Sequence, residues 1–351
     1  MAEATQTKTT IAIDPVTRIE GHLKAEVVVE NGKVVDAKLT GGMYRGFESI
    51  LRGRHPRDAA QIVQRICGVC PTAHATAASI ALEKASGTAV PSNGRATRNL
   101  ILGANYLQSH ILHFYHLAGQ DFIQGPDTAP FMPRYAKPDL RLPPAINAVG
   151  VDQYVEALEV RAVCHEMVAL FGGRMPHVHG ILAGGAAEIP TKEKLVEYAA
   201  RFKKVRKFVE EKYLPVVYLV GSQYKDLGAF GQGYRNALCV GVFPLDDEGK
   251  EFVFKAGAYQ DGKDMPFDVK RVTEDVKFSW FADSTSGKPF TKGENVLEVD
   301  KKGAYSFVKA PLYNGKPMEV GPLARMWVNN KPISPIGQKL FKEYFGLDVK
   351  N

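Results

Sequence analysis

Hydrophobic and polar residues alternate with a period of two near the start of the chain. Residues 10–13 form a short apolar run that predicts a strand. Residues 23–30 and 34–39 place apolar side chains at every second position, and Asn31-Gly32 between them favours a type I′ turn. The N-terminal region is therefore expected to hold a strand followed by an antiparallel β hairpin.

The middle of the chain has the longer apolar period of helices. Helices are predicted at residues 59–66, 71–86, 95–122, 151–171 and 192–213, the last of them with Thr191 as N-cap. Residues 125–144 contain six prolines and predict an extended loop. This part of the chain is expected to be a bundle of long helices.

From Leu214 onward, short Val, Tyr and Phe runs such as residues 239–243 alternate with turn residues, and a helical pattern returns at 336–344. The fold class is therefore predicted as α+β, with a largely helical core, an N-terminal β hairpin and a mixed α/β C-terminal region. Three regions are expected: an N-terminal one at 1–55, a helical core at 56–213 and a mixed region at 214–351.

Composition narrows the function classes. The 351 residues are long enough for a large core, and 45% hydrophobic with 24% charged residues is ordinary for a globular protein. No apolar run is long enough to span a membrane, and residues 1–10 are too polar for a secretory signal. The basic cluster at 203–207 shares its predicted helix with acidic residues and lacks stacking aromatics, so it predicts a solvated face rather than nucleic-acid binding.

The strongest candidate for chemistry is the segment Cys67-Gly-Val-Cys70-Pro-Thr-Ala-His74. A helix that begins at Pro71 would place Cys70 at its N-terminus, where a thiolate is favoured, and His74 one turn further on. The other cysteines, Cys164 and Cys239, are single. The spacing alone leaves three interpretations open: a metal centre completed elsewhere, a redox pair, or inert packing.

The other candidates carry weaker signals. Glu20 and Glu48 stand beside glycines, so each carboxylate could face a cleft, although surface or capping acids fit the same pattern. Histidines at 110, 113 and 116 spread around one predicted helix, and we expect them to bond to the backbone rather than to a metal. Two further histidines, at 177 and 179, lie in a predicted loop.

Several segments together resemble one family, the large subunit of nickel–iron hydrogenases, and most of all its nickel–iron–selenium branch. The matching segments are residues 14–22 (DPVTRIEGH), 44–48 (YRGFE), 65–74 (RICGVCPTAH), 98–100 with 113–116, and 321–325 (GPLAR). The resemblance runs from about Thr9 to the C-terminus. A related respiratory quinone-reductase subunit shares that fold but generally lacks the cysteines, so a non-catalytic or scaffold homologue of that kind is the alternative.

The resemblance implies a role for each candidate residue. Cys67 would be a terminal thiolate ligand of nickel, and Cys70 would bridge nickel to an iron that carries carbon monoxide and cyanide. His74 would donate to the bridging sulfur. Glu20 would relay the proton released from H2, and Glu48 would help to bind magnesium or iron at a second site.

The resemblance also implies partners. Electrons would leave through iron–sulfur clusters in a small subunit, since this chain has no cysteine set for such clusters. Enzymes of this family are commonly periplasmic and exported with the small subunit, and a cytoplasmic location is also compatible with the sequence.

The sequence departs from the family at two points. Ser109 stands where many relatives have aspartate, which favours the selenium branch. The family's second motif, Asp-Pro-Cys-x-x-Cys with selenocysteine as the first cysteine in that branch, is not in the printed sequence. A separate C-terminal polypeptide, a truncated gene or fragment, and a degenerate homologue are the alternatives. We expect this chain alone not to assemble the centre.

Overall fold

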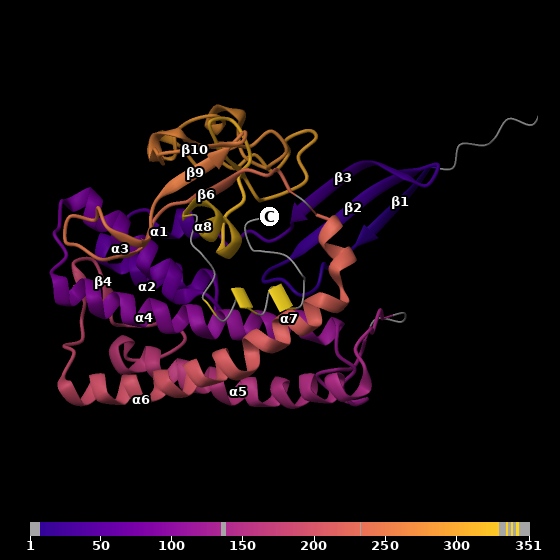
Figure 1. Cartoon of the computed structure of the whole chain (residues 1–351). Coiled ribbons are helices and arrows are strands. Elements are labelled where there is room, and N and C mark those ends of the chain that lie inside the picture. Colours follow the sequence, from indigo (N-terminus) through magenta and orange to yellow (C-terminus); the bar gives the residue numbers. More distant parts are fainter. Residues whose placement is uncertain are drawn as a thin grey trace, which may run out of the picture. The chain divides into compact units, whose positions relative to one another are not determined.

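The computed structural model describes residues 8–134, 138–231 and 233–329, with isolated positions beyond them. These form helices and several small antiparallel sheets, which confirms the α+β prediction (Figure 1). The chain divides into two compact units, Met1–Ser49 with Pro266–Glu319, and Ile50–Met265 with Val320–Asn351. The three regions expected from the sequence stay a prediction.

The first unit contains the predicted hairpin. Three strands pair antiparallel in the order β1-β2-β3: β1 (Lys8–Ile13), β2 (Leu23–Glu30) and β3 (Lys33–Gly41). Asn31 and Gly32 both have positive φ angles, as a type I′ turn requires, so the hairpin prediction is confirmed. A second antiparallel pair closes this unit, β11 (Val272–Asp275) with β12 (Ala310–Tyr313).

Short helical turns complete the first unit, and the chain leaves it within α1. They are η7 (Val269–Arg271), η8 (Asp283–Thr285), η9 (Phe290–Lys292) and α1 (Phe47–Leu51). Lys301 stabilises this unit, because its ammonium donates to the carbonyl oxygens of Val276 and Phe281 and to the Asp283 carboxylate.

The second unit is built on long helices, which run beside one another in Figure 1. Their bounds are η1 (Pro56–Asp58), α2 (Ala59–Ile62), η2 (Val63–Ile66), α3 (Pro71–Ser86), α4 (Ser92–Ile111), η3 (Leu112–Ala118), η4 (Gly119–Asp121), α5 (Pro144–Gly172), α6 (Lys192–Phe208), η5 (Val209–Tyr213), α7 (Leu214–Gln223), η6 (Lys225–Ala229) and α8 (Pro322–Asn329). Helix α4 packs against α5, and α5 against α6.

The same unit carries short strands. They are β4 (Ile181–Leu182), β5 (Gly185–Ala186), β6 (Ala237–Cys239), β7 (Val242–Pro244), β8 (Phe252–Phe254), β9 (Gly257–Gln260) and β10 (Lys263–Met265). Three of them form a sheet in the order β10-β9-β6, and α8 packs on β6 and β9.

Helical periodicity explains the core between α4 and α5. Ile101, Ala104 and Ile111 are fully buried on α4, at the spacing of one helix face. Cys164 and Met167 are fully buried on α5 and belong to the same cluster. The hydrophobic effect thus holds together the two longest helices of the described chain.

Two helices differ from their predicted bounds. Helix α5 begins at Pro144, seven residues before the expected start at 151, because proline suits a first helical position. The predicted change of structure at Leu214 is wrong, since α7 continues the helix to Gln223. Val216 and Val220 are buried there at i and i+4, so packing overrides the strand preference of valine. The helix expected at 336–344 lies largely outside the described residues.

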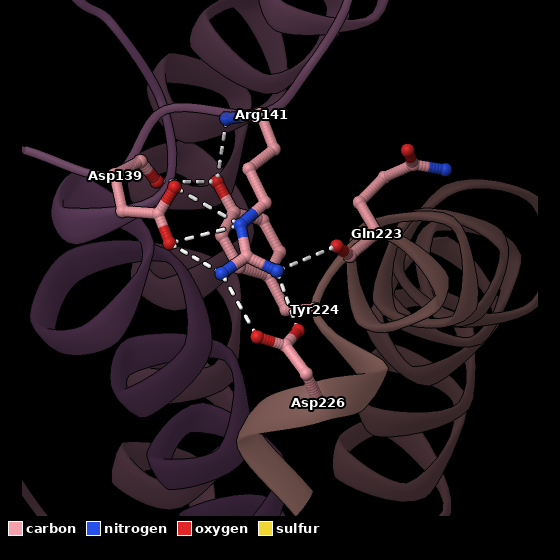
Figure 2. Close-up of polar contacts among 5 residues, drawn as sticks. All are labelled: Asp139, Arg141, Gln223, Tyr224 and Asp226. Atoms are coloured by element: carbon pink, nitrogen blue, oxygen red, sulfur yellow. Dashed lines mark hydrogen bonds and ion pairs between the residues drawn. The ribbon is translucent and has the colours of Figure 1, made fainter.

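The loop before α5 is tied to the end of α7 by Arg141 (Figure 2). Its guanidinium donates to the carboxylates of Asp139 and Asp226 and to the carbonyl oxygen of Gln223. It also lies 4.7 Å from the ring centroid of Tyr224, whose hydroxyl donates to the Asp139 carbonyl. We call these five residues the Arg141 clamp.

Candidate metal-binding site

The segment with the two cysteines is a loop between two helices, as predicted. Turn η2 ends at Ile66, and Cys67 follows it in an extended conformation with φ −144° and ψ 131°. Pro71 is the first residue of α3, and Cys70 is its N-cap. Helix α3 ends at Gly87, which takes the left-handed conformation common at helix ends. Local sequence signals therefore explain how the loop is delivered.

The sulfur of Cys67 is buried and hydrogen-bonded. Only 7% of the residue is exposed. Its Sγ accepts the backbone N–H groups of Val69 and Cys70, each at 3.3 Å. Hydrogen bonds donated to sulfur favour the thiolate, the form that binds metals. All four cysteines of the chain carry thiols rather than disulfides.

A buried glutamine on α4 holds the same loop. The Nε2 of Gln108 donates to the carbonyl oxygen of Val69 at 3.3 Å, and the residue is 1% exposed. Its Oε1 lies 3.4 Å from Nε2 of His165 on α5. The sequence analysis missed Gln108. A polar residue on the apolar face of a long helix was the available signal.

A second contact fixes the helix that leads into the loop. Gln61 and Gln64 both donate from Nε2 to the carbonyl oxygen of Val178, and Gln64 is fully buried. Val178 lies between the two loop histidines, and His179 is exposed. On the long helix, Nε2 of His116 lies 3.1 Å from the Tyr154 carbonyl oxygen, in line with the expected backbone bond.

His74 lies on the first turns of α3, where its backbone N–H donates to the carbonyl oxygen of Cys70 at 3.4 Å. Burial lowers the pKa of His74 below its ordinary value. The imidazole is therefore neutral at pH 7 and offers one N–H donor and one acceptor nitrogen. These properties suit a hydrogen-bond donor to a metal-bound sulfur.

Helix α3 is held to α4 by a buried ion pair. Arg98 Nη2 donates to Glu83 Oε1 at 2.5 Å and Nη1 to Oε2 at 3.2 Å, with both side chains about nine-tenths buried. Arg98 also donates to the carbonyl oxygens of Leu182 and Gly185, and the Gly184 N–H donates to Glu83. The two charges thus have several partners, as buried charges require.

The predicted acids lie in the first unit. Glu20 is exposed in the turn between β1 and β2, and Glu48 is exposed in the first turn of α1. Among the described residues, no three His, Cys, Asp or Glu side chains form a group suited to hold a metal ion. The described site therefore offers Cys67 and Cys70 as soft donors with His74 behind them. Sulfur donors of this kind fit nickel and iron.

Comparison with known proteins identifies the class. A model described as nickel-dependent hydrogenase matches residues 45–125 and 122–346, and a model described as HoxL-like matches residues 10–40. The chain therefore belongs to the nickel-dependent hydrogenase family.

Individual relatives narrow this to one branch. The chain is 60% identical to the periplasmic [NiFeSe] hydrogenase large subunit of Desulfomicrobium baculatum, over 98% of this chain and 68% of that protein. It is 33% identical to the hydrogenase-2 large chain of Escherichia coli K12, over 91% of this chain and 67% of that one.

Solved structures agree. A Ni-Fe-Se hydrogenase structure from D. vulgaris Hildenborough matches with a TM-score of 0.94 and 70% identity, over 98% of this chain and 71% of that chain. The likeness to the nickel–iron–selenium branch of the large subunit, expected from the sequence motifs, is confirmed.

Proposed function

We propose that this chain supplies two of the thiolate ligands of a hydrogenase catalytic centre, with H2 as its substrate. The observation that supports this most directly is Cys67, whose buried sulfur accepts two backbone N–H groups within the motif of the family. The scaffold alternative is not favoured, because the relatives reported above are hydrogenases.

In this proposal, Cys67 is a terminal ligand of nickel, and Cys70 bridges nickel to an iron that carries carbon monoxide and cyanide. When bound, these metals supply the polarising and redox-active site that splitting of H2 requires. The protein fixes the sulfur of Cys67 through backbone N–H groups, and His74 donates to the bridging sulfur from one turn into α3.

The proposal gives the acids two different tasks. Glu20 takes the proton from the site and passes it toward solvent, a role for which its exposed carboxylate is suited. Glu48 contributes a hard oxygen ligand to a second site for magnesium or iron. Both assignments rest on the family motifs that contain these residues.

Electrons leave, in this proposal, through iron–sulfur clusters of a small subunit. The sequence has four cysteines, and Cys164 and Cys239 are buried and separate, so we assign the clusters to the partner. The remaining ligands of the centre are assigned to a polypeptide that corresponds to the part of the relatives outside the match. A fragment of a longer large subunit would meet the same need.

The complex is assigned to the periplasm, because one relative is named as periplasmic. Export with the small subunit is part of this assignment, and a cytoplasmic complex is the alternative. Within the described chain, every helix is too short or too polar to cross a membrane.

The test is reconstitution. The chain is co-produced with a small subunit and with the C-terminal part of a [NiFeSe] large subunit, and H2-dependent dye reduction and bound nickel are measured. We expect activity in the complex and no tightly bound nickel in the single chain. A complex that binds nickel but never reduces dye would refute the catalytic role, and a single chain with nickel and activity would refute the need for a second polypeptide.

A further inference from the structure

One peptide unit links Gln108 to the sulfur of Cys67. The carbonyl oxygen of Val69 accepts a hydrogen bond from Gln108 Nε2, and the N–H of Cys70 donates to Cys67 Sγ, both at 3.3 Å. The Val69 carbonyl and the Cys70 N–H belong to the same peptide group. We propose that Gln108 is a positioning residue for Cys67 and acts through the Val69–Cys70 peptide.

The neighbours of Gln108 determine which way its amide points. If its oxygen faced the Val69 carbonyl, two acceptors would meet without a proton between them. With Nε2 on that side, the Gln108 oxygen faces His165 Nε2 at 3.4 Å. Burial lowers the pKa of His165, so its ring is neutral and carries its proton on Nε2 to donate to Gln108. Three elements, α5, α4 and the cysteine loop, are thereby connected.

This connection affects the sulfur as well as the loop. A hydrogen bond to a peptide carbonyl polarises the peptide and strengthens the hydrogen bond that its N–H donates. Gln108 and Cys67 are both buried, at 1% and 7% exposure, so water competes little with either bond. A stronger N–H bond withdraws electron density from the sulfur, which raises the reduction potential of a metal bound there.

The inference rests on the proposed function only where it concerns a metal on Cys67. The hydrogen bonds themselves exist in the chain alone and can be tested there. The informative variants are Gln108→Met, which keeps the length of the side chain without a donor, and Gln108→Glu, which keeps its shape but turns an oxygen toward the Val69 carbonyl. Asn99→Leu is the matched control, because Asn99 on the same helix donates its side-chain amide to the Pro244 carbonyl instead.

The first measurement is hydrogen exchange of the segment 67–70 in the single chain. We expect exchange at Val69 and Cys70 to be about tenfold faster in both Gln108 variants, as for loss of one net hydrogen bond. The Asn99→Leu variant should leave this segment unchanged. Equal exchange in the Gln108 variants and the control would overturn the inference, and if one Gln108 variant fails to fold, the other decides.

The second measurement is the midpoint potential of nickel in the reconstituted complex. We expect a lower potential in the Gln108 variants than in Asn99→Leu, because the sulfur keeps more electron density. A potential equal to the control would overturn the effect on the sulfur. Absence of nickel from the unaltered complex would instead refute the proposed function, and the exchange experiment would still decide the role of Gln108.

Discussion

The Arg141 clamp and the cysteine loop both tie distant segments of the second unit together, but by opposite means. The clamp uses full charges at the surface, with Arg141 between two exposed carboxylates (Figure 2). The loop uses neutral amides in the interior, with Gln108 and two backbone N–H groups around Cys67. Water screens the first arrangement and is largely excluded from the second.

The difference shows what each region requires. A surface clamp only has to hold a loop, and exposed ion pairs do so weakly at little desolvation cost. A sulfur that binds a metal needs a fixed position and a fixed electrostatic environment, and neutral hydrogen bonds provide both without burying a further charge. We expect mutations in the two regions to separate function from stability.

Replacement of Cys67 should have the largest effect on function. We expect Cys67→Ala to abolish nickel binding and H2-dependent dye reduction in the reconstituted complex, a loss of at least about 100-fold, since one thiolate ligand is removed. Thermal unfolding of the single chain should change little. Cys164→Ala is the control, because Cys164 is a buried thiol in the core between α4 and α5. Activity retained in Cys67→Ala would remove the ligand assignment.

Loss of the buried pair between α3 and α4 should have the largest effect on stability. Arg98→Met leaves Glu83 buried without its charge partner, and we expect the free energy of unfolding to fall by about 3–5 kcal/mol. Urea unfolding followed by circular dichroism measures this. Replacing both residues with apolar ones should restore part of the loss. A single variant as stable as the original chain would show that Glu83 finds another partner.

The buried histidines should make stability depend on pH. Burial lowers the pKa of His165 and of His116 in the folded chain, so between their ordinary value of about 6.5 and the lowered value the unfolded chain binds more protons. Their contribution is complete above about pH 6.5 and falls as the pH decreases. We expect melting temperatures to drop from pH 7 to pH 5, and His165→Gln to reduce the slope. An unchanged slope would indicate that other groups dominate this range.

Weakening the clamp should have the smallest effect. Arg141→Lys removes the paired hydrogen bonds to Asp139 and Asp226, and we expect a fall in melting temperature of about 1–2 °C with unchanged activity. High salt should shrink the difference. Arg206→Lys, which alters a single exposed ion pair with Glu210, is the control. A fall as large as that of Arg98→Met would contradict the comparison.

The clamp should also respond at a different pH from the loop. Hydrogen bonds from Arg141 lower the pKa of Asp139 and of Asp226. A carboxylate with a lowered pKa stabilises the fold above its ordinary pKa, about 4, and loses this contribution as the pH falls through the lowered value. The difference between Arg141→Lys and the original chain should therefore vanish in acid. A difference that persists at pH 2 would show that the stacking on Tyr224 carries the effect.

Short-range patterns predicted much of what the structure contains. The hairpin at Asn31-Gly32, the first turn of α3 at Pro71 and its end at Gly87 follow from residues within a few positions of one another. The motif with Cys67 and Cys70 belongs to the same class, and its family was predicted correctly. The roles of Glu20 and Glu48 stay predictions, because they depend on groups far away in the sequence.

The sequence by itself determined the chemistry that the chain offers: two thiols at a fixed spacing, a histidine one turn away and helices that begin and end beside them. Only the tertiary structure decided that Gln108 holds the Val69 carbonyl, that Arg141 reaches Asp226 across 85 positions, and that residues 214–223 are helical. Local geometry follows from torsion preferences and bonds between near neighbours. Contacts between distant residues follow from how whole faces pack, and side-chain identity alone does not specify them.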